Sequence, residues 1–149
     1  MRGLNGRVVL VAGGAGGIGT ATSKRLGEEG ASVVVADLNA ESAAEVAEGI
    51  RSAGGKARAT AIDLRSEESV AAAVALTVEH FGGLDVLHAN AADLSPETIG
   101  QDTDAASIPL DAFDRTIAVN LRGHLLCARH AIPQLLERYS LGRTAFSWK

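Results

Sequence analysis

Five glycines lie within residues 13–19, close to the amino end of the chain. An apolar run, residues 8–12, precedes them, and a helix-compatible run, residues 20–29, follows them. Where a helix begins after such a turn, its first backbone N–H groups lack partners within the helix, and the helix dipole is positive there. Glycine lets a phosphate approach the backbone because no side chain holds it off. The segment therefore predicts a phosphate-binding turn, and we expect a dinucleotide to bind it.

Two spacings of these glycines fit dinucleotide-binding turns. Gly14-x-Gly16-x-x-Gly19 is the general fingerprint, and Gly13-x-x-x-Gly17-x-Gly19 is a wider one. A glycine pattern alone is weak evidence, because glycine-rich turns occur in many loops. A strand before it, a helix after it and an acidic residue at the end of the second strand strengthen it. The alternative is a tight strand–helix turn that binds no ligand.

Asp37 follows the second apolar run, residues 33–36, and bears on the choice of cofactor. A carboxylate at the end of this strand can accept hydrogen bonds from both ribose hydroxyls of NAD, and it would repel the 2′-phosphate of NADP. Leu38 comes next, where an NADP site often has an arginine. We therefore expect NAD as the cofactor, in preference to NADP. The alternative is that Asp37 caps the helix predicted to follow.

The elements that position these residues alternate along the chain. Apolar runs predict strands over residues 8–12, 33–36 and 84–88. An alternation of polar and small residues predicts a weaker strand over residues 56–62, at a sheet edge. Helices are predicted between them, and a long helix over residues 113–136, which Pro133 should kink or break. This alternation implies an α/β Rossmann-type doubly wound parallel sheet in three layers, α/β/α. We expect one domain over residues 1–138, incomplete at its C-terminal side, and a tail over residues 139–149.

The composition excludes several classes of protein. A formal charge of −4 argues against a nucleic-acid-binding surface. Cys127 is the only cysteine and His124 and His130 do not share a helix face, so we expect neither a disulfide framework nor a metal site. No apolar run reaches membrane-spanning length, and the amino end reads as a strand and not as a signal peptide. We expect a cytoplasmic protein without membrane or nucleic-acid partners.

Later motifs favour the wider glycine spacing. Asn90-Ala91-Ala92 follows the fourth predicted strand, and Val119-Asn120-Leu121-Arg122-Gly123 lies in the long helix. Asp63-Leu64 ends the third predicted strand. With these motifs in this order, residues 5–138 resemble the N-terminal part of a short-chain dehydrogenase/reductase. The sequence departs from the family pattern at Ala12, where the family has Thr, and at Ala89 and Ala92, where it has Asn and Gly.

The resemblance implies a role for each motif. Asn120 would join the catalytic residues by holding a water molecule in the proton relay; the alternative is a buried Asn whose side chain bonds a neighbouring backbone. Asp63 would accept from the adenine amino group, or it simply closes a turn. Asn90 would lie beside a cofactor ribose. The expected cofactor-binding residues are Gly13, Gly16, Gly17, Ile18, Gly19, Asp37, Leu38, Asp63, Leu64, Asn90 and Ala91.

The family's remaining catalytic residues have no counterpart in the sequence. Its Ser lies after a fifth strand, and its Tyr and Lys stand four residues apart on a later helix. Tyr139 is the only tyrosine here, and Arg143 stands four residues on. We therefore expect a truncated, inactive form of an NAD(P)-dependent oxidoreductase that acts on a small alcohol or carbonyl compound.

Two other functions stay open on the sequence. One is a non-catalytic NAD-binding or interaction module. The other is a methyltransferase, against which the Asn120 motif and the Gly17-x-Gly19 spacing argue. Full-length members of the family form homo-oligomers, but whether this chain does is open, as is the identity of its substrate.

Overall fold

Four parallel strands form the sheet at the centre of the computed structural model, which describes residues 3–101 and 103–140. The strands are β1 (Val8–Ala12), β2 (Ser32–Asp37), β3 (Lys56–Ala61) and β4 (Val86–Ala89), and their order in the sheet is β3-β2-β1-β4. The four predicted strands are confirmed, and β3 lies at an edge as expected. The chain moves outward from β1 to β3 and then crosses back to β4. Between β1 and β4 the direction of winding reverses, and ligands of such sheets bind at this point.

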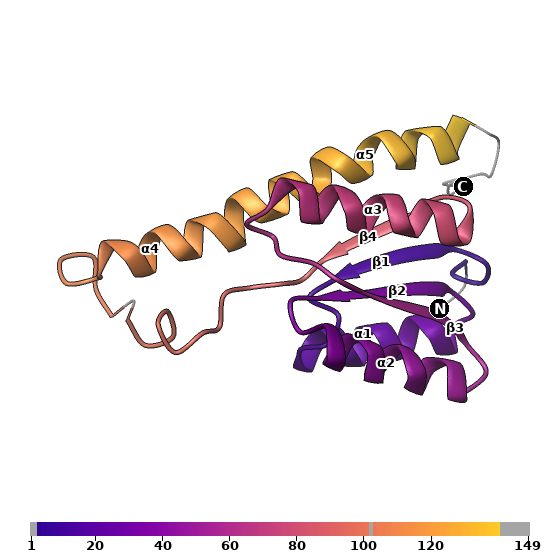
Figure 1. Ribbon diagram of the computed structural model, residues 1–149, viewed down its shortest axis with the longest axis horizontal. Coiled ribbons are helices and arrows are strands. Elements are labelled where there is room, and N and C mark those ends of the chain that lie inside the picture. Colours follow the sequence, from indigo (N-terminus) through magenta and orange to yellow (C-terminus); the bar gives the residue numbers. More distant parts are fainter. Residues whose placement is uncertain (1–2, 102, 141–149) are drawn as a thin grey trace.

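Helices cover both faces of the sheet (Figure 1). Helices α1 (Gly17–Glu28) and α2 (Ala40–Ser52) lie on one face, and α3 (Glu67–Phe81) and α5 (His124–Ser140) lie on the other. Each strand packs against both helix layers, because successive side chains along a strand point to opposite faces of the sheet. Val9 and Val11 pack toward α2, whereas Leu10 and Ala12 pack toward α3 and α5. The three-layer Rossmann-type architecture predicted from the alternating pattern is confirmed.

The long helix is interrupted in a place that the sequence pattern did not predict. It consists of α4 (Leu110–Thr116), a π-helical segment η1 (Ile117–Gly123) and α5. Of the kink or break expected at Pro133, the break is wrong, because α5 continues through that residue. Wide π turns inside helices often accompany functional sites. In this chain the wide turn contains Asn120.

Close packing fixes the end of this wide turn. A Cβ added to Gly123 would lie 2.7 Å from the Cβ of Leu64, so a glycine is needed where the helix crosses the chain that leaves β3. The α4 end of the helix extends away from the sheet, with the loop after β4 beneath it (Figure 1).

A buried ionic cluster holds the opposite, amino-terminal edge of the sheet. The Asp85 carboxylate accepts from the Val8 backbone N–H at 2.9 Å and from Arg7 at 3.1 Å. Arg138, near the end of α5, donates to Asp85 at 3.2 and 3.3 Å and to the Gly82 carbonyl at 2.8 Å. Charged groups so deeply buried need partners. The cluster therefore ties the end of α5 to the start of β4.

No described helix is both long enough and apolar enough to span a bilayer. The tail predicted over residues 139–149 begins inside α5, which extends to Ser140, and residues 141–149 lie outside the described residues.

Candidate functional site

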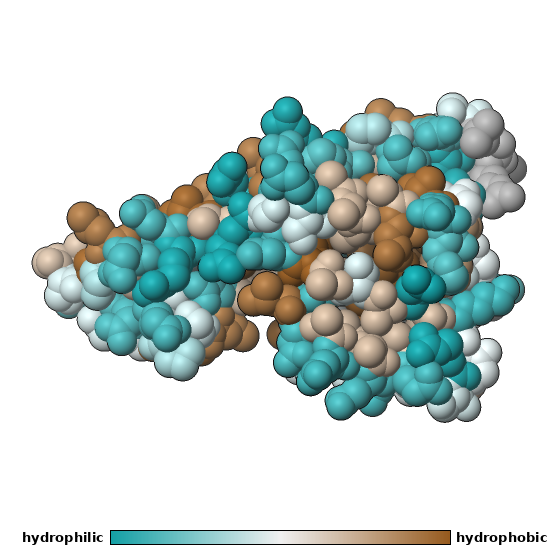
Figure 2. Space-filling view, in the orientation of Figure 1, coloured by the Kyte–Doolittle hydropathy of each residue, from teal (hydrophilic) through white to brown (hydrophobic). Residues whose placement is uncertain are grey.

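A cleft of about 1400 Å³ opens where the four strands end. Figure 2 shows an indentation of the surface between the part that carries α4 and the part that carries α1 and α2. All four strand ends contribute to its wall, because parallel strands bring their carboxyl ends to one edge. The lining residues that the sequence singled out are Gly13, Gly16, Gly17, Ile18, Asp37, Leu38, Asp63, Leu64, Asn90 and Ala91.

The glycines of the turn fall into two groups. Gly13 has a φ of +79°, and a Cβ there would lie 2.6 Å from the backbone of Ala91. A Cβ on Gly19 would lie 1.8 Å from the carbonyl oxygen of Gly13. Gly16 and Gly17, in contrast, face open space toward the cleft. Gly13 and Gly19 therefore allow the turn to close, and Gly16 and Gly17 leave room in front of it.

The start of α1 lacks the caps that the neighbouring helices have. Its N-cap residue, Gly16, has no side chain to accept a hydrogen bond, and its first turn holds no acidic residue. Asn39 caps α2 and Ser66 caps α3, each with acidic residues in the first turn. Exposed N–H groups and the positive end of a helix dipole favour an anion. An anionic group in the cleft could therefore cap α1.

Asp37 connects the end of β2 to the glycine turn. Its Oδ2 accepts from the Ala15 backbone N–H at 2.9 Å, and its Oδ1 accepts from the Asn39 N–H at 3.1 Å. The alternative that Asp37 caps α2 is wrong, because Asn39 Oδ1 accepts from the Ser42 N–H at 3.0 Å and serves as that cap. Leu38 extends into solvent at the cleft, with 68% of its surface exposed.

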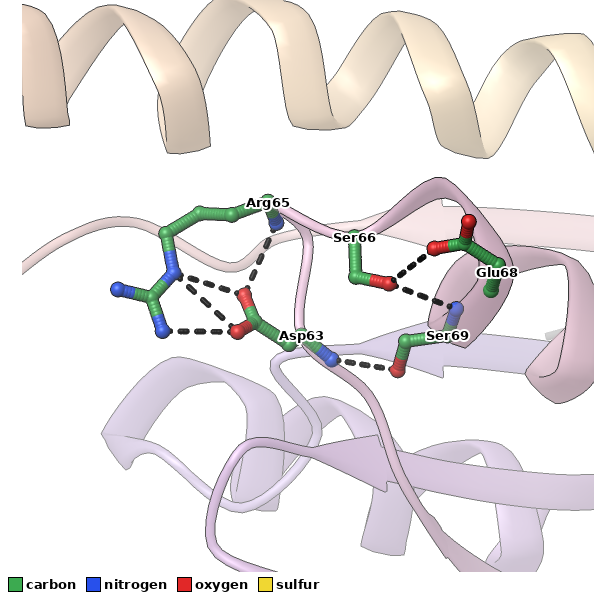
Figure 3. Close-up of polar contacts among 5 residues, drawn as sticks. All are labelled: Asp63, Arg65, Ser66, Glu68 and Ser69. Atoms are coloured by element: carbon green, nitrogen blue, oxygen red, sulfur yellow. Dashed lines mark hydrogen bonds and ion pairs between the residues drawn. The ribbon is translucent and has the colours of Figure 1, made fainter.

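Asp63 is paired with Arg65, a residue that belongs to none of the sequence motifs (Figure 3). Its carboxylate accepts from Arg65 at the backbone N (2.9 Å), Nε (2.9 Å) and Nη2 (2.7 Å). The hydrogen bonds from the Arg65 side chain are the largest cause that lowers the pKa of Asp63, and the same contacts raise the pKa of Arg65. Asp63 does close a turn, as one of its two expected roles required, and it also lines the cleft.

Asn90 links the end of β4 to the end of β1. Its side-chain N–H donates to the Gly13 carbonyl at 3.1 Å, and its backbone N–H donates to the Ala12 carbonyl at 2.9 Å. His124 Nε2 contacts the Ala91 carbonyl at 2.8 Å, so the nitrogen carries the proton and donates it. The segment after β4 is thereby held to the glycine turn on one side and to α5 on the other.

Asn120 lies in the wide turn and faces the loop after β4. Its Oδ1 accepts from the backbone N–H of Asp93 at 3.0 Å. It is exposed, so the expected alternative of a buried Asn does not hold, although its side chain does bond a backbone group. Neither Asn120 nor Gly19 lines the cleft.

The loop after β4 is braced by its own polar groups. The Asp93 carboxylate accepts from the Ser95 N–H at 3.0 Å and from the Thr98 hydroxyl at 2.9 Å. These hydrogen bonds, first the one from the Ser95 backbone, lower the pKa of Asp93. Arg115 of α4 donates to the Glu97 carbonyl at 3.0 Å. The loop is thus a defined wall of the cleft. Arg65 and Arg115 both line it, and no motif in the sequence pointed to either residue.

Comparison with known proteins identifies the family. Residues 7–144 match the family described as short chain dehydrogenase. The chain is 42% identical over 126 residues to cis-4-hydroxycyclohexanecarboxylate dehydrogenase of Sinomonas cyclohexanicum, covering 85% of this chain and 48% of that protein. It is 41% identical over 139 residues to short-chain dehydrogenase reductase 5 of Arabidopsis thaliana, covering 93% of this chain and 51% of that protein.

The fold also agrees with a solved member of the family. The crystal structure of NAD⁺-bound xylitol dehydrogenase superimposes with a TM-score of 0.82 at 32% identity, over 92% of this chain and 51% of that one. The chain therefore belongs to the short-chain dehydrogenase family, whose members are NAD(P)-dependent oxidoreductases. It spans about half the length of the relatives that it matches.

Proposed function

We propose that this chain binds NAD in the cleft and is the cofactor-binding half of an oxidoreductase. The observation that carries the proposal is the position of Asp37. Its carboxylate lies at the end of β2 and bonds Ala15 of the glycine turn, beside the uncapped start of α1. A dinucleotide needs an acceptor for ribose hydroxyls next to donors for its pyrophosphate, and this pairing supplies both.

Each wall of the cleft then has a role. The first N–H groups of α1 would hold the pyrophosphate, which Gly16 and Gly17 leave room for. Asp63 and Leu64 would contact the adenine, and Asn90 and Ala91 would lie beside the nicotinamide ribose. When bound, NAD supplies the hydride-accepting ring. In a complete enzyme, Asn120 would hold a water molecule of the proton relay.

The charges around the cleft favour NAD over NADP. Four carboxylates (Asp37, Asp63, Asp93 and Glu97) and two arginines (Arg65 and Arg115) line it. Arg65 is paired with Asp63, so its charge is balanced before any cofactor arrives. A 2′-phosphate would therefore meet Asp37 without an unpaired cation at the adenine side.

The relatives favour one type of reaction, the oxidation of an alcohol or, in reverse, the reduction of a carbonyl compound. Two of the three relatives named above are dehydrogenases of cis-4-hydroxycyclohexanecarboxylate and of xylitol, both alcohols. We propose the same class, a small alcohol or carbonyl compound, for the complete enzyme. The sequence given holds no Tyr-x-x-x-Lys pair, so we propose that these 149 residues alone bind NAD without turnover.

Calorimetric titration of the purified chain with NAD, NADP and S-adenosylmethionine tests the proposal. We expect NAD to bind, NADP to bind more weakly and S-adenosylmethionine not to bind. Absence of NAD binding would refute the proposed function, and binding of S-adenosylmethionine alone would favour a methyltransferase. The proposed lack of turnover is tested by incubating the chain with NAD and a panel of alcohols and monitoring the absorbance of NADH. Measurable formation of NADH would contradict it.

A further inference from the structure

Arg65 is a cleft residue to which neither the motifs nor the comparisons assign a role. It follows β3 by a short turn and lies in the cleft wall with Leu38, Ile62 and Leu64. More than half of its side chain, 56%, is exposed. Yet its guanidinium is fixed, because Nε and Nη2 both donate to the Asp63 carboxylate, at 2.9 and 2.7 Å.

The turn that holds this pair is itself anchored to α3 (Figure 3). The Asp63 backbone N–H donates to the Ser69 hydroxyl at 2.9 Å, and Ser66 caps the helix by accepting from the Ser69 N–H. The guanidinium is therefore a rigid, flat group on an anchored turn. A pre-ordered flat cation loses little freedom when a ligand packs against it.

The neighbouring strand end supplies an apolar partner for the opposite face of a ligand. Leu38 follows β2, lines the cleft and is 68% exposed, so its side chain can pack against a ligand. Ile62, which leaves β3 beside it, is only 2% exposed and belongs to the core. A flat aromatic ring between the Leu38 side chain and the Arg65 guanidinium would make dispersion contacts on one face and a cation–π contact on the other. Asp37 marks this end of the cleft as the ribose end.

We propose that Arg65 belongs to the adenine subsite, where its guanidinium plane stacks on the base while Asp63 holds that plane in position. The inference rests on the proposed binding of NAD and deepens it. Asp63 keeps a role of its own in the subsite. A carboxylate has about four acceptor positions, and three N–H groups of Arg65 are directed at them. These are the backbone N–H, Nη2, and Nε, whose single hydrogen is shared between Oδ1 at 2.9 Å and Oδ2 at 3.2 Å. One position is left for the 6-amino group of adenine.

The test separates the two halves of the cofactor. Wild type, Arg65→Ala and Arg65→Lys are titrated with ADP-ribose by calorimetry and with nicotinamide mononucleotide by NMR chemical shifts. Arg58→Ala is the matched control, because Arg58 is an exposed arginine of β3 outside the cleft. Thermal unfolding of each variant without ligand reports the state of the fold.

We expect Arg65→Ala to weaken ADP-ribose binding about fivefold. Arg65→Lys should lose most of the same affinity, because lysine keeps the charge but not the plane. Nicotinamide mononucleotide should bind all variants alike, and Arg58→Ala should match wild type throughout. If Arg65→Ala does not fold, Arg65→Lys carries the comparison.

The assignment of Arg65 fails if its variants bind ADP-ribose as tightly as wild type does. It also fails if their affinity for nicotinamide mononucleotide falls as much as their affinity for ADP-ribose. In either case wild-type binding of NAD would leave the proposed function standing. If wild type binds neither NAD nor ADP-ribose, the proposed function and this inference fail together.

Discussion

The carbonyl oxygen of Gly13 occupies the space that a Cβ on Gly19 would need, with only 1.8 Å between them. The first turn of α1 therefore packs directly on the backbone that leaves β1. No rotation of a side chain can relieve this contact, because both partners are backbone or Cβ atoms. The turn must open before any larger residue fits at position 19.

We expect Gly19→Ala to lower the free energy of unfolding by about 3 kcal/mol or more, since overpacking of this kind forces the backbone to move. Urea unfolding measures the loss. Gly16→Ala is the control at a position with open space, an extended backbone and a φ of −71°. Gly16→Ala should leave the free energy of unfolding near that of wild type. It should weaken the binding of NAD, because the added methyl group enters the cleft. Equal stability of the two variants would contradict this division of the glycines.

Replacement of Asp37 should change the choice of cofactor. Asp37→Asn keeps an acceptor for only one of the two neighbouring N–H groups, those of Ala15 and Asn39, and removes the negative charge that faces a 2′-phosphate. We expect the ratio of NAD to NADP affinity to fall about tenfold, on the order of 1.4 kcal/mol. Calorimetric titration with both cofactors measures it. Glu45→Gln, an exposed site on α2 outside the cleft, loses the same charge and should leave the ratio unchanged. An unchanged ratio in Asp37→Asn would count against NAD selectivity through this charge.

Removal of the Asn120 side chain should loosen the loop after β4. Asn120→Ala deletes the acceptor of the Asp93 N–H, a hydrogen bond worth about 1 kcal/mol. We expect faster hydrogen exchange at the Asp93 amide, with the amides of β1 unaffected. Leu121→Ala, at a side chain that is 62% exposed, is the neighbouring control. Slow exchange at Asp93 in Asn120→Ala would show that the loop is held by other contacts.

Asp85 should make stability depend on pH. Burial acts to raise the pKa of Asp85, but hydrogen bonds from the Val8 N–H, Arg138 and Arg7 outweigh it, and the pKa lies below its ordinary value. A carboxyl group with a lowered pKa in the folded state contributes stability above its unfolded pKa of about 3.9. That contribution is lost as the pH falls through the lower, folded pKa.

Asp85→Asn should therefore cost about 3 kcal/mol at pH 7, because it leaves two arginines near an uncharged group in a buried site. The difference from wild type should shrink steadily below about pH 4. Chemical unfolding at a series of pH values measures both effects. Asp114→Asn, an exposed carboxyl of α4, should show neither. A difference from wild type that stays constant down to acidic pH would contradict the role of the Asp85 charge.

Much of the fold followed from local patterns. The uniformly apolar runs at residues 8–12 and 33–36 became strands buried on both faces, and the mixed run at residues 56–62 became an edge strand. The interruption of the long helix was expected at Pro133 and not at residues 117–123, because the apolar spacing does not reveal a π turn. The turn ends at Gly123, which packs closely against Leu64, a residue far from it in the sequence.

The sequence by itself determined which residues gather at the cleft, because the carboxyl ends of parallel strands must meet at one edge of the sheet. Gly13, Asp37, Asp63 and Asn90 each follow a strand, so their neighbourhood could be inferred from order alone. Only the tertiary structure decided what each one contacts. It paired Asp63 with Arg65, placed the side chain of Asn120 on the Asp93 backbone, and separated the glycines that close the turn from those that leave it open. The Asp63–Arg65 pair depends on the conformation of one turn, and the other contacts depend on distances of a few ångströms between separate elements, which spacing along the chain does not encode.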